Sequence, residues 1–326
     1  MVKHDMIVIG ASAGGIEALI KLVGLLPADL PASICVAVHV RPETVSNLPT
    51  VLRRASPLEA VHPRFHETIQ QGYIYVAPPN WHMTLTENQV HLVDGPRENG
   101  ARPAVDPLFR SAAEKLGPRV IGIVLSGSLD DGTAGIAAIK AHGGITIAQD
   151  PNEADFPSMP QSAIDNVGVD HVARVSEIAS LVIQLTKHTD ADPVAQQNNA
   201  AAQPEQFSTA EKTWHYQFSC PDCGGVLLPQ EEGDYIHFRC EVGHMYSPQS
   251  LFGEQTKAVE NGLWLAIRTL HEKARLATNI ATQMRERGND YSAVHFDEQA
   301  QVATDHADAI EKVLSKVHID PNTTTD

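Results

Sequence analysis

The sequence of 326 residues lacks any long apolar run. No stretch of 18 consecutive apolar residues occurs, and only Met1 to Asp5 precede the first apolar segment. A membrane-spanning helix needs about 20 apolar residues in a row, and a secretory leader needs an apolar stretch of about 7–15 residues near its start. We therefore expect a cytoplasmic protein that is neither inserted into a membrane nor secreted.

Basic residues are also scarce. The chain has 24 lysines and arginines against 40 aspartates and glutamates, which gives a formal net charge of −16. A chain with this excess of negative charge is repelled at long range by nucleic acids and by acidic lipid surfaces. The composition therefore argues against nucleic acid as a partner.

Cysteine is limited to four positions. Cys35 falls in an apolar, strand-like run, whereas Cys220, Cys223 and Cys240 cluster in one short polar segment. Disulfides belong to oxidising compartments, and clustered cysteines in a reducing compartment more often bind a metal. We therefore predict a metal site instead of disulfides.

Residues 6–187 alternate short β-branched runs with segments of helical length. This alternation is typical of an α/β domain, with a doubly wound, mostly parallel sheet and helices on both faces. Two of the runs, at 82–86 and 89–93, are separated by only two residues and predict a local antiparallel hairpin inserted in that sheet. The expected strands are MIVIG, SICVAVHV, GYIYVAPP, HMTLT, QVHLV, RVIGIVLSG and GITIAQD.

The rest of the chain differs in composition. Residues 189–212 are rich in Ala, Gln, Asn and Pro and have few large apolar side chains, as a linker does. Two long helical patterns, at roughly 249–287 and 291–317, flank the turn sequence RGND and predict a helical hairpin. The predicted division is 1–188 for the α/β domain, 189–212 for a flexible linker, 213–248 for a small cysteine-containing module and 249–326 for a helical tail.

The segment MIVIGASAGGIEAL, residues 6–19, fits two different chemistries. A dinucleotide-binding loop needs G-x-G-x-x-G and an acidic residue about 20 positions later. Gly10 and Gly15 fit that pattern, but Ser12 takes the middle glycine position. His39 stands where the acidic residue is expected. A nucleophile elbow instead needs G-x-S-x-G between a strand and a helix, and the letters GASAG match it.

Other polar residues complete the elbow interpretation. Ser12, His39 and an aspartate of SGSLDDG, either Asp130 or Asp131, each follow a predicted strand. The carboxyl ends of parallel strands meet at one edge of a sheet, so these side chains are expected to converge. A neutral imidazole can take the serine proton, a carboxylate can orient the imidazole, and the backbone N–H of Ala13 can face an oxyanion. Capping of the following helix is the competing explanation for either aspartate.

Six segments between residues 6 and 187 stand in an order and spacing that resemble one family, the chemotaxis protein-glutamate methylesterases of the CheB type. The order Ser, His, Asp also separates the chain from the α/β-hydrolases, which have Ser, Asp, His. The segments that carry the resemblance are GASAGG, VAVHVRP, GYIYVAPPNWHM, RPAVDPLFRSAA, VIGIVLSGSLDDGTAGIAAIKAHGGITIAQD and SMPQSAI.

The resemblance implies a role for each site residue. It makes Ser12 the nucleophile, His39 the base and Asp131 the triad carboxylate. It makes the backbone N–H groups of Ala13 and Ser128 the oxyanion donors. The implied reaction is hydrolysis of γ-glutamyl methyl esters on the cytoplasmic helices of methylated chemoreceptors, with release of methanol and without a cofactor. Deamidation of receptor glutamines is the related reaction that the resemblance implies.

Three departures from the family pattern keep a second hypothesis open. Gly127, Ser128 and Leu129 stand where the family has Gly-Met-Gly, and Ala13 stands where it has Thr. Regulated members carry a receiver domain ahead of the catalytic one, whereas Ser12 is the twelfth residue here, so we expect no switching by a receiver within this chain. The second hypothesis is a methylesterase-like interaction module with weak or no activity. A nucleotide-binding domain is the third.

The cysteine cluster has the spacing of a zinc ribbon. The segments CPDCGG and FRCEVGH give C-x2-C, sixteen residues and then C-x3-H. Three thiolates and one imidazole fill a tetrahedral Zn²⁺ site and leave no position for water, so a structural zinc is expected. His237 and His215 are the alternative imidazole ligands, and the acidic flanks favour a module that does not bind nucleic acid. The predicted ligands are Cys220, Cys223, Cys240 and His244.

Overall fold

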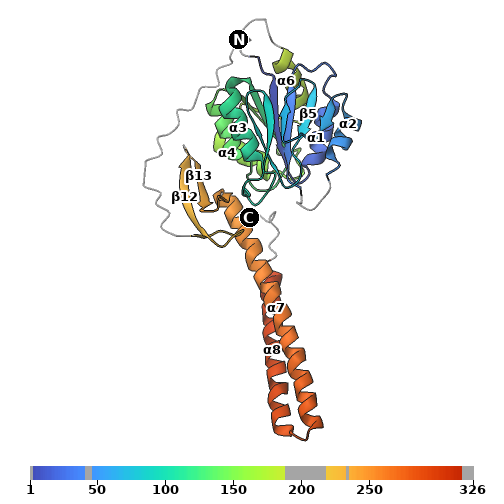
Figure 1. Cartoon of the computed structure of the whole chain (residues 1–326), viewed down its shortest axis with the longest axis vertical. Helices are drawn as coiled ribbons and strands as arrows, with labels where there is room; N and C mark the ends of the chain where they lie inside the picture. Colours follow the sequence, from blue (N-terminus) through green and yellow to red (C-terminus); the bar gives the residue numbers. More distant parts are fainter. Residues whose placement is uncertain (1–2, 41–45, 188–217, 233–234, 318–326) are drawn as a thin grey trace. The chain divides into compact units, whose positions relative to one another are not determined.

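The computed structural model describes residues 3–40, 46–187, 218–232 and 235–317. Contacts divide the chain into two units, Met1–Leu251 and Phe252–Asp326, and Figure 1 draws both. No helix in the described part of the chain is long and apolar enough to cross a membrane. The predicted linker at 189–212 lies outside the described residues.

The first unit is built on a seven-stranded sheet in which all neighbouring strands are parallel. The strand order is β10-β9-β8-β1-β2-β5-β3. Every residue of β1, β2 and β8 is buried, as expected for the aliphatic runs of a sheet that is covered on both faces. The strands are β1 (Met6–Ala11), β2 (Ser33–Val38), β3 (Glu59–Val61), β5 (Tyr73–Val76), β8 (Val120–Val124), β9 (Ile145–Gln149) and β10 (His171–Ala173).

Helices cover both faces of this sheet, with α1 and α2 on one side and α3 and α4 on the other in Figure 1. Alternate residues of β1 point to opposite faces. Ile7 and Ile9 join the core under α1, α2 and α6, whereas Met6 and Val8 join the core under α3, α4 and α5. The predicted doubly wound α/β class is therefore confirmed. The helices are α1 (Gly15–Gly24), α2 (Leu48–Ala55), α3 (Val105–Leu116), α4 (Thr133–Ala141), α5 (Ser158–Val167) and α6 (Val175–Lys187).

The predicted hairpin is present but is not part of the parallel sheet. β6 (His82–Leu85) pairs antiparallel with β7 (Gln89–Val93), and β7 pairs on its other side with β4 (His66–Thr68), so these three strands form a sheet of their own. Met83 and Val90 are buried in the core on the α3 side, so the hairpin covers that helix instead of extending the main sheet. The strands β3, β4 and β10 have only three residues each, which is too short for a recognisable periodic pattern.

The first unit also contains a small antiparallel sheet of four strands, in the order β11-β12-β13-β14. Its few buried residues include two cysteines, Cys220 and Cys240, packed with Leu227, Phe238 and Tyr246. A core of this size rarely holds a fold by itself, so a bound metal is the expected additional support. The strands are β11 (Phe218–Ser219), β12 (Val226–Glu232), β13 (Tyr235–Cys240) and β14 (Met245–Tyr246).

Two long helices follow: α7 (Pro248–Glu286), whose first residues belong to the first unit, and α8 (Asp290–Val317). They form the predicted helical hairpin. Gly288, with φ of +73°, ends the first helix, and the side-chain oxygen of Asn289 caps the second by accepting from the N–H of Ser292 (3.2 Å). Beyond Leu251, small side chains dominate the buried positions of the two helices, which are Ala274, Ala277, Ala281, Ala293, Ala303, Ala307, Ile267 and Leu314.

Gly10 of β1 has no room for a side chain. A Cβ atom at this position would overlap Cγ1 of Val105 in α3 and lie 2.9 Å from its Cγ2. We expect Gly10→Ala to lower the free energy of unfolding by about 1–3 kcal/mol, because the added methyl group overpacks the contact between β1 and α3. Urea unfolding measures the change.

Val105→Ala supplies the matched control for this prediction. If the methyl group clashes with Val105, the double variant Gly10→Ala/Val105→Ala loses less stability than the sum of the two single variants. Strictly additive losses contradict the packing explanation.

Candidate active site

Three adjacent strands bring the predicted site residues to one edge of the sheet. β8, β1 and β2 are neighbours, Ser12 follows β1 directly, and His39 follows β2 directly. The N–H of His39 donates to the carbonyl of Ala11 (3.2 Å), so the pairing of the two strands continues to that edge. Asp131 lies in the loop between β8 and α4. Carboxyl ends of parallel strands are where open α/β sheets place their binding and catalytic residues.

The imidazole of His39 contacts the carboxylate of Asp131. Nε2 of His39 lies 2.6 Å from Oδ2 of Asp131, whose side chain is 2% exposed, whereas that of His39 is 22% exposed. A buried carboxylate in this position orients the imidazole and stabilises its protonated form. Because Nε2 is engaged by Asp131, Nδ1 is the ring nitrogen that is left to accept a proton.

The carboxylate of Asp131 also caps the N-terminus of α3. Its Oδ2 accepts from the N–H of Val105 (2.7 Å). Its Oδ1 accepts from the N–H of Asp106 (3.3 Å) and from the side-chain amide of Asn99 (2.9 Å). Burial opposes ionisation, but the hydrogen bond and positive charge of His39, together with these N–H groups, hold the pKa of Asp131 below its usual range. Asp131 is thus held as an anion.

The capping in the structure differs from the capping expected from the sequence, in which Asp130 or Asp131 caps the helix that follows it. The N-cap residue of α4 is Gly132, with φ of +94°, so neither Asp130 nor Asp131 occupies the N-cap position of that helix. The helix that Asp131 caps is α3, which precedes it in the chain. The same carboxylate can therefore bind His39 and a helix N-terminus at once.

Asp106 is a supporting residue that no sequence motif singles out. Its Oδ1 accepts from the N–H of Gly135 in α4 (2.7 Å), and its Oδ2 accepts from the amide of Asn99 (3.1 Å). Burial, and then the charge of nearby Asp131, raise the pKa of Asp106 well above its usual value. The two helices are thus capped reciprocally, because Asp131 precedes α4 and caps α3, whereas Asp106 belongs to α3 and caps α4.

Ser12 lies in the turn between β1 and α1. Its N–H donates to the carbonyl of Ser126 (3.0 Å) in the loop after β8. Gly14 has φ of +67°, and a Cβ on Gly15 would lie 2.7 Å from the carbonyl oxygen of Ser126, so the turn needs both glycines. Among the described residues, no hydrogen bond joins the Ser12 hydroxyl to His39. The backbone conformation of Gly14 and the close contact at Gly15 explain why these positions are glycine, so a bound phosphate is not needed to explain them.

The two predicted oxyanion donors belong to loops that meet at this turn. In the described part of the chain, neither the N–H of Ala13 nor that of Ser128 donates a hydrogen bond. A Cβ on Gly127 would overlap Sδ of Met159 and lie 2.9 Å from Cβ of Ser12, so only glycine lets the two loops approach this closely. Backbone N–H groups without a partner among the described residues remain available to a bound oxyanion.

The predicted metal ligands come together in the small sheet. The ligand atoms of Cys220, Cys223, Cys240 and His244 all lie within 4.8 Å of one another, and none of the four cysteines of the chain forms a disulfide. Sγ of Cys240 lies 3.7 Å from Sγ of Cys223 and 3.5 Å from Nδ1 of His244. Ligand atoms about 2.0–2.3 Å from a tetrahedral ion are separated by about 3.3–3.8 Å, so the donor set fits.

The thiols of this cluster differ in acidity. Burial raises the pKa of Cys220 to about 11. Burial also acts on Cys240, but hydrogen bonds from His244 and Cys223 outweigh it and lower the pKa of Cys240 to about 7. At least one ligand is therefore readily available as a thiolate.

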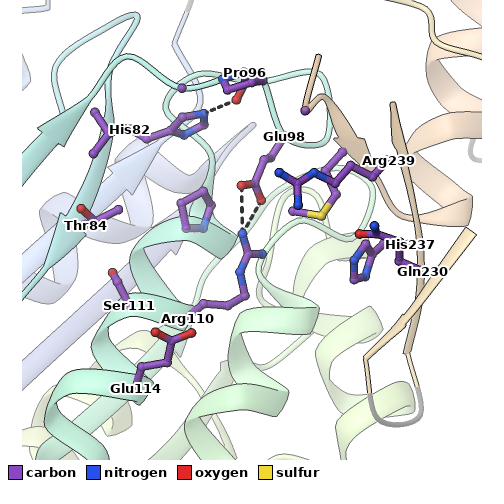
Figure 2. A pocket seen from close by; sticks show the side chains of 15 residues that line it. His82, Thr84, Pro96, Glu98, Arg110, Ser111, Glu114, Gln230, His237 and Arg239 are labelled. Atoms are coloured by element: carbon purple, nitrogen blue, oxygen red, sulfur yellow. Dashed lines mark hydrogen bonds and ion pairs between the residues drawn. The ribbon is translucent and has the colours of Figure 1, made fainter. Parts of the chain in front are cut away.

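A cavity of ≈ 790 Å³ lies elsewhere in the first unit, and Figure 2 shows its lining. Glu98 forms an ion pair with Arg110 (2.6 Å) on one wall. His237, one of the alternative metal ligands, lines this cavity and is not part of the cysteine group. His215, the other alternative, lies outside the described residues. None of the predicted triad residues is among the described residues that line the cavity.

The fold and its polar edge define an α/β domain with a hydrolase-type site, and known proteins identify its family. The family profile described as CheB methylesterase matches residues 7–182. A putative protein-glutamate methylesterase/protein-glutamine glutaminase of Leptospira interrogans is 34% identical over 187 residues, which cover 57% of this chain and 97% of that protein. The chain therefore belongs to the CheB methylesterase family.

Two further comparisons show how far the likeness extends. The protein-glutamate methylesterase/protein-glutamine glutaminase of Pyrococcus horikoshii is 34% identical over 182 residues, which cover 55% of this chain but only 50% of that protein. The crystal structure of the Thermotoga maritima CheB methylesterase catalytic domain matches with a TM-score of 0.54 and 31% identity, covering 56% of this chain and all of that one. The small sheet and the long helices lie beyond the residues matched by the family profile.

Leu129 has a backbone conformation that leucine rarely adopts. Its φ is +63°, at the position where the family resemblance places a glycine. The left-handed conformation costs an L-residue roughly 1–2 kcal/mol. We therefore expect Leu129→Gly to be more stable than Leu129→Ala by about 1 kcal/mol, as measured by urea unfolding.

Both of these variants lack the leucine side chain, so their comparison isolates the backbone term. Equal stability of the glycine and alanine variants contradicts the assigned strain. The same pair of variants, assayed for activity, also reports whether the strained loop matters for the chemistry.

Proposed function

We propose that this chain is a protein-glutamate methylesterase. It hydrolyses γ-glutamyl methyl esters on chemoreceptor-type signalling proteins, releases methanol, and deamidates glutamines as a second reaction. The observation that carries the proposal is the buried contact between His39 and Asp131 beside the serine turn. The names of the matched relatives supply the substrate class. The partners are the methylated cytoplasmic helices of such receptors, which places the reaction in the cytoplasm.

Acylation begins with Ser12. Its hydroxyl oxygen attacks the ester carbonyl carbon while the free nitrogen of His39 takes the hydroxyl proton. Asp131 stabilises the imidazolium that forms. The N–H groups of Ala13 and Ser128 bind the tetrahedral oxyanion. Collapse of this intermediate breaks the bond to the methoxy oxygen, which leaves as methanol with the proton from His39, and Ser12 holds the glutamyl acyl group.

Deacylation uses the same residues in reverse. His39 removes a proton from water, the water oxygen attacks the acyl carbon, and the bond to Ser12 breaks as His39 returns the proton to the serine oxygen. The product carboxylic acid then loses its proton to solvent and leaves as glutamate. With a glutamine substrate the first leaving group is ammonia instead of methanol. These steps need only this chain, the substrate and water.

Two observations bear on the alternative of a weakly active interaction module. The structure records no hydrogen bond between the Ser12 hydroxyl and His39 among the described residues, and Leu129 strains the adjacent loop. Catalytic hydrogen bonds often tighten only when substrate binds, so this geometry is compatible with either function. A fluorophosphonate probe separates them, because it labels Ser12 only if the serine is activated.

The proposal also assigns a role to each of the other parts of the chain. We take residues 1–188 as the methylesterase domain, 189–212 as a linker, 213–248 as a zinc-ribbon-like module and 249–326 as a helical tail. Three thiols and an imidazole are the donors that Zn²⁺ prefers in structural sites. When bound, the ion supplies cross-linking of the small sheet and takes no part in the ester chemistry.

Removal of the Ser12 hydroxyl tests the proposed function directly. We expect Ser12→Ala to lower methanol release from methylated receptor by at least about 10³-fold, because the covalent step is lost, and to leave the free energy of unfolding nearly unchanged. Wild-type protein assayed in parallel is the control. Substantial methanol release by the variant means that Ser12 is not the nucleophile.

A metal count tests the zinc assignment. We expect about one Zn²⁺ per wild-type chain, and less than half of this in Cys240→Ser, because a serine hydroxyl does not replace a thiolate ligand. His237→Ala is the matched control and should keep the full metal content. Full occupancy in Cys240→Ser, or loss of metal in His237→Ala, rules out the assigned ligand set.

A further inference from the structure

The segment that leaves the cysteine cluster lies directly on the loop that precedes α3. Met245 follows the ligand His244 in the chain, and its N–H donates to the carbonyl of Arg97 (3.2 Å). Its carbonyl accepts from the N–H of Asn99 (2.8 Å). These two backbone hydrogen bonds join β14 of the small sheet to a loop of the α/β domain.

Two serines of the same segment bind the aspartate beside the triad carboxylate. The hydroxyl groups of Ser247 and Ser250 both donate to Oδ1 of Asp130, at 2.7 Å and 2.8 Å. Ser250 is 0% exposed and Asp130 is 8% exposed, so water does not compete for the bond between these two side chains. The position of Asp130, and therefore of its neighbour Asp131, depends on this segment.

Asn99 connects the segment to the triad carboxylate itself. Its side-chain oxygen accepts from the N–H of Ser247 (3.0 Å), and its side-chain nitrogen donates to Oδ1 of Asp131 (2.9 Å). An amide has one acceptor and one donor end, so the bond to Ser247 determines which end faces Asp131. Asn99 also has φ of +51°, a conformation that asparagine tolerates better than most residues.

The α/β domain holds the other side of this loop. Arg110 of α3 binds both carboxylate oxygens of Glu98 (2.6 Å and 2.9 Å), and the imidazole of His82 bonds to the carbonyl of Pro96 (2.9 Å), as Figure 2 shows. A Cβ on Gly243 would lie 2.9 Å from Cγ of Pro96, so the small sheet packs tightly against the loop. The loop is held from both sides.

Residues 245–250 directly follow the predicted metal ligand His244, so the Cys3His cluster determines where this segment starts. The carbonyl of His244 accepts from the N–H of Cys240 (3.1 Å), and the hydroxyl of Tyr246 donates to Asp222 (2.6 Å) between the first two cysteines. A metal bound by the cluster fixes His244 relative to Cys240, and Met245 starts at that point. Metal binding and the position of residues 245–250 are therefore linked.

We propose that the Cys3His module positions the catalytic carboxylate: residues 245–250 hold Asn99 and Asp130, and through them they hold Asp131 in its contact with His39. Ser247, Ser250 and Asn99 are then positioning residues, and metal binding is coupled to the reactivity of Ser12. The kinetic test of this positioning role depends on the proposed function. The amide hydrogen-exchange test depends only on the hydrogen bonds described above.

The first test compares Ser247→Val with Ser247→Thr in the full chain, because these side chains have nearly the same shape and differ in the hydroxyl. We expect Ser247→Val to bind metal fully but to lose about tenfold in kcat for methanol release, with KM changed by less than about twofold. Ser247→Thr should keep wild-type kcat. Ser247→Val also removes a helix cap, because the Ser247 hydroxyl accepts from the N–H of Ser250 at the start of α7 (3.0 Å). Asn289→Ala, which removes the cap of α8, is the control for that loss and should also keep wild-type kcat.

The second test measures amide hydrogen exchange with and without metal. Removal of the metal by a chelator should speed exchange of the N–H of Asn99, which donates to Met245, and of the N–H of Val105, which donates to Asp131. Ser247→Val should speed exchange at Val105 more than Ser247→Thr does. Wild-type exchange at both positions in metal-free protein, or wild-type kcat in Ser247→Val, overturns the proposal.

These outcomes can be told apart from failure of the proposed function. If wild-type protein releases no methanol, the methylesterase assignment fails, and the exchange experiment still decides whether the module positions Asp131. If Ser247→Val stays fully active while Ser12→Ala is inactive, the methylesterase assignment stands and the positioning role fails.

Discussion

A single buried negative charge, the carboxylate of Asp131, organises the candidate active site. A carboxylate in an apolar interior is costly unless its oxygens are satisfied, and here four donors meet it: two N–H groups at the start of α3, the amide of Asn99 and the imidazole of His39. The donors come from two distant parts of the sequence, since His39 follows β2 and the other three belong to residues 99–106. The requirement to satisfy this charge therefore brings the end of β2, the loop before α3 and the loop after β8 to one place.

Close packing at glycine supplies the second constraint. Gly10, Gly15 and Gly127 lie where a methyl group would meet α3, the carbonyl of Ser126 or the side chain of Met159. The turn with Ser12 thus approaches the loop after β8 more closely than any larger residue allows. The two constraints act together. The hydrogen bonds to Asp131 need the loops to lie close to one another, and the glycines permit this close approach.

The sequence predicts those features that depend on local pattern. The buried runs of β1, β2 and β8, the two long helices and the C-x2-C and C-x3-H spacings are all short-range signals, and the structure has the elements in those places. The sequence predicts that β6 and β7 pair, but the predicted location of this hairpin within the parallel sheet is wrong. Its pairing with β4 and its packing on α3 are contacts between segments far apart in the chain, which no local pattern predicts.

The same reasoning explains which residues of the candidate site could be predicted from the sequence. Ser12 and His39 follow strong strand patterns, so their positions at the sheet edge could be inferred from the sequence. Asp106 and Asn99 could not, because their partners are reached only through the contact of α3 with α4 and through the segment after His244. Asp106 binds the N–H of Gly135, and Asn99 binds the carbonyl of Met245. Both partners are backbone groups far away in the chain, so no local sequence pattern predicts these contacts.

The reciprocal capping of α3 and α4 also determines how this site can be exchanged between relatives. Each helix N-terminus is completed by an acidic residue from the other helix or its preceding loop, so neither the 126–132 loop nor the start of α3 is a self-contained part. A chimaera that takes only one of them pairs a helix end with a foreign partner. Asp106 and Asp131 are 25 positions apart in the chain. The segments that contain them therefore have to be exchanged together if both caps are to be kept.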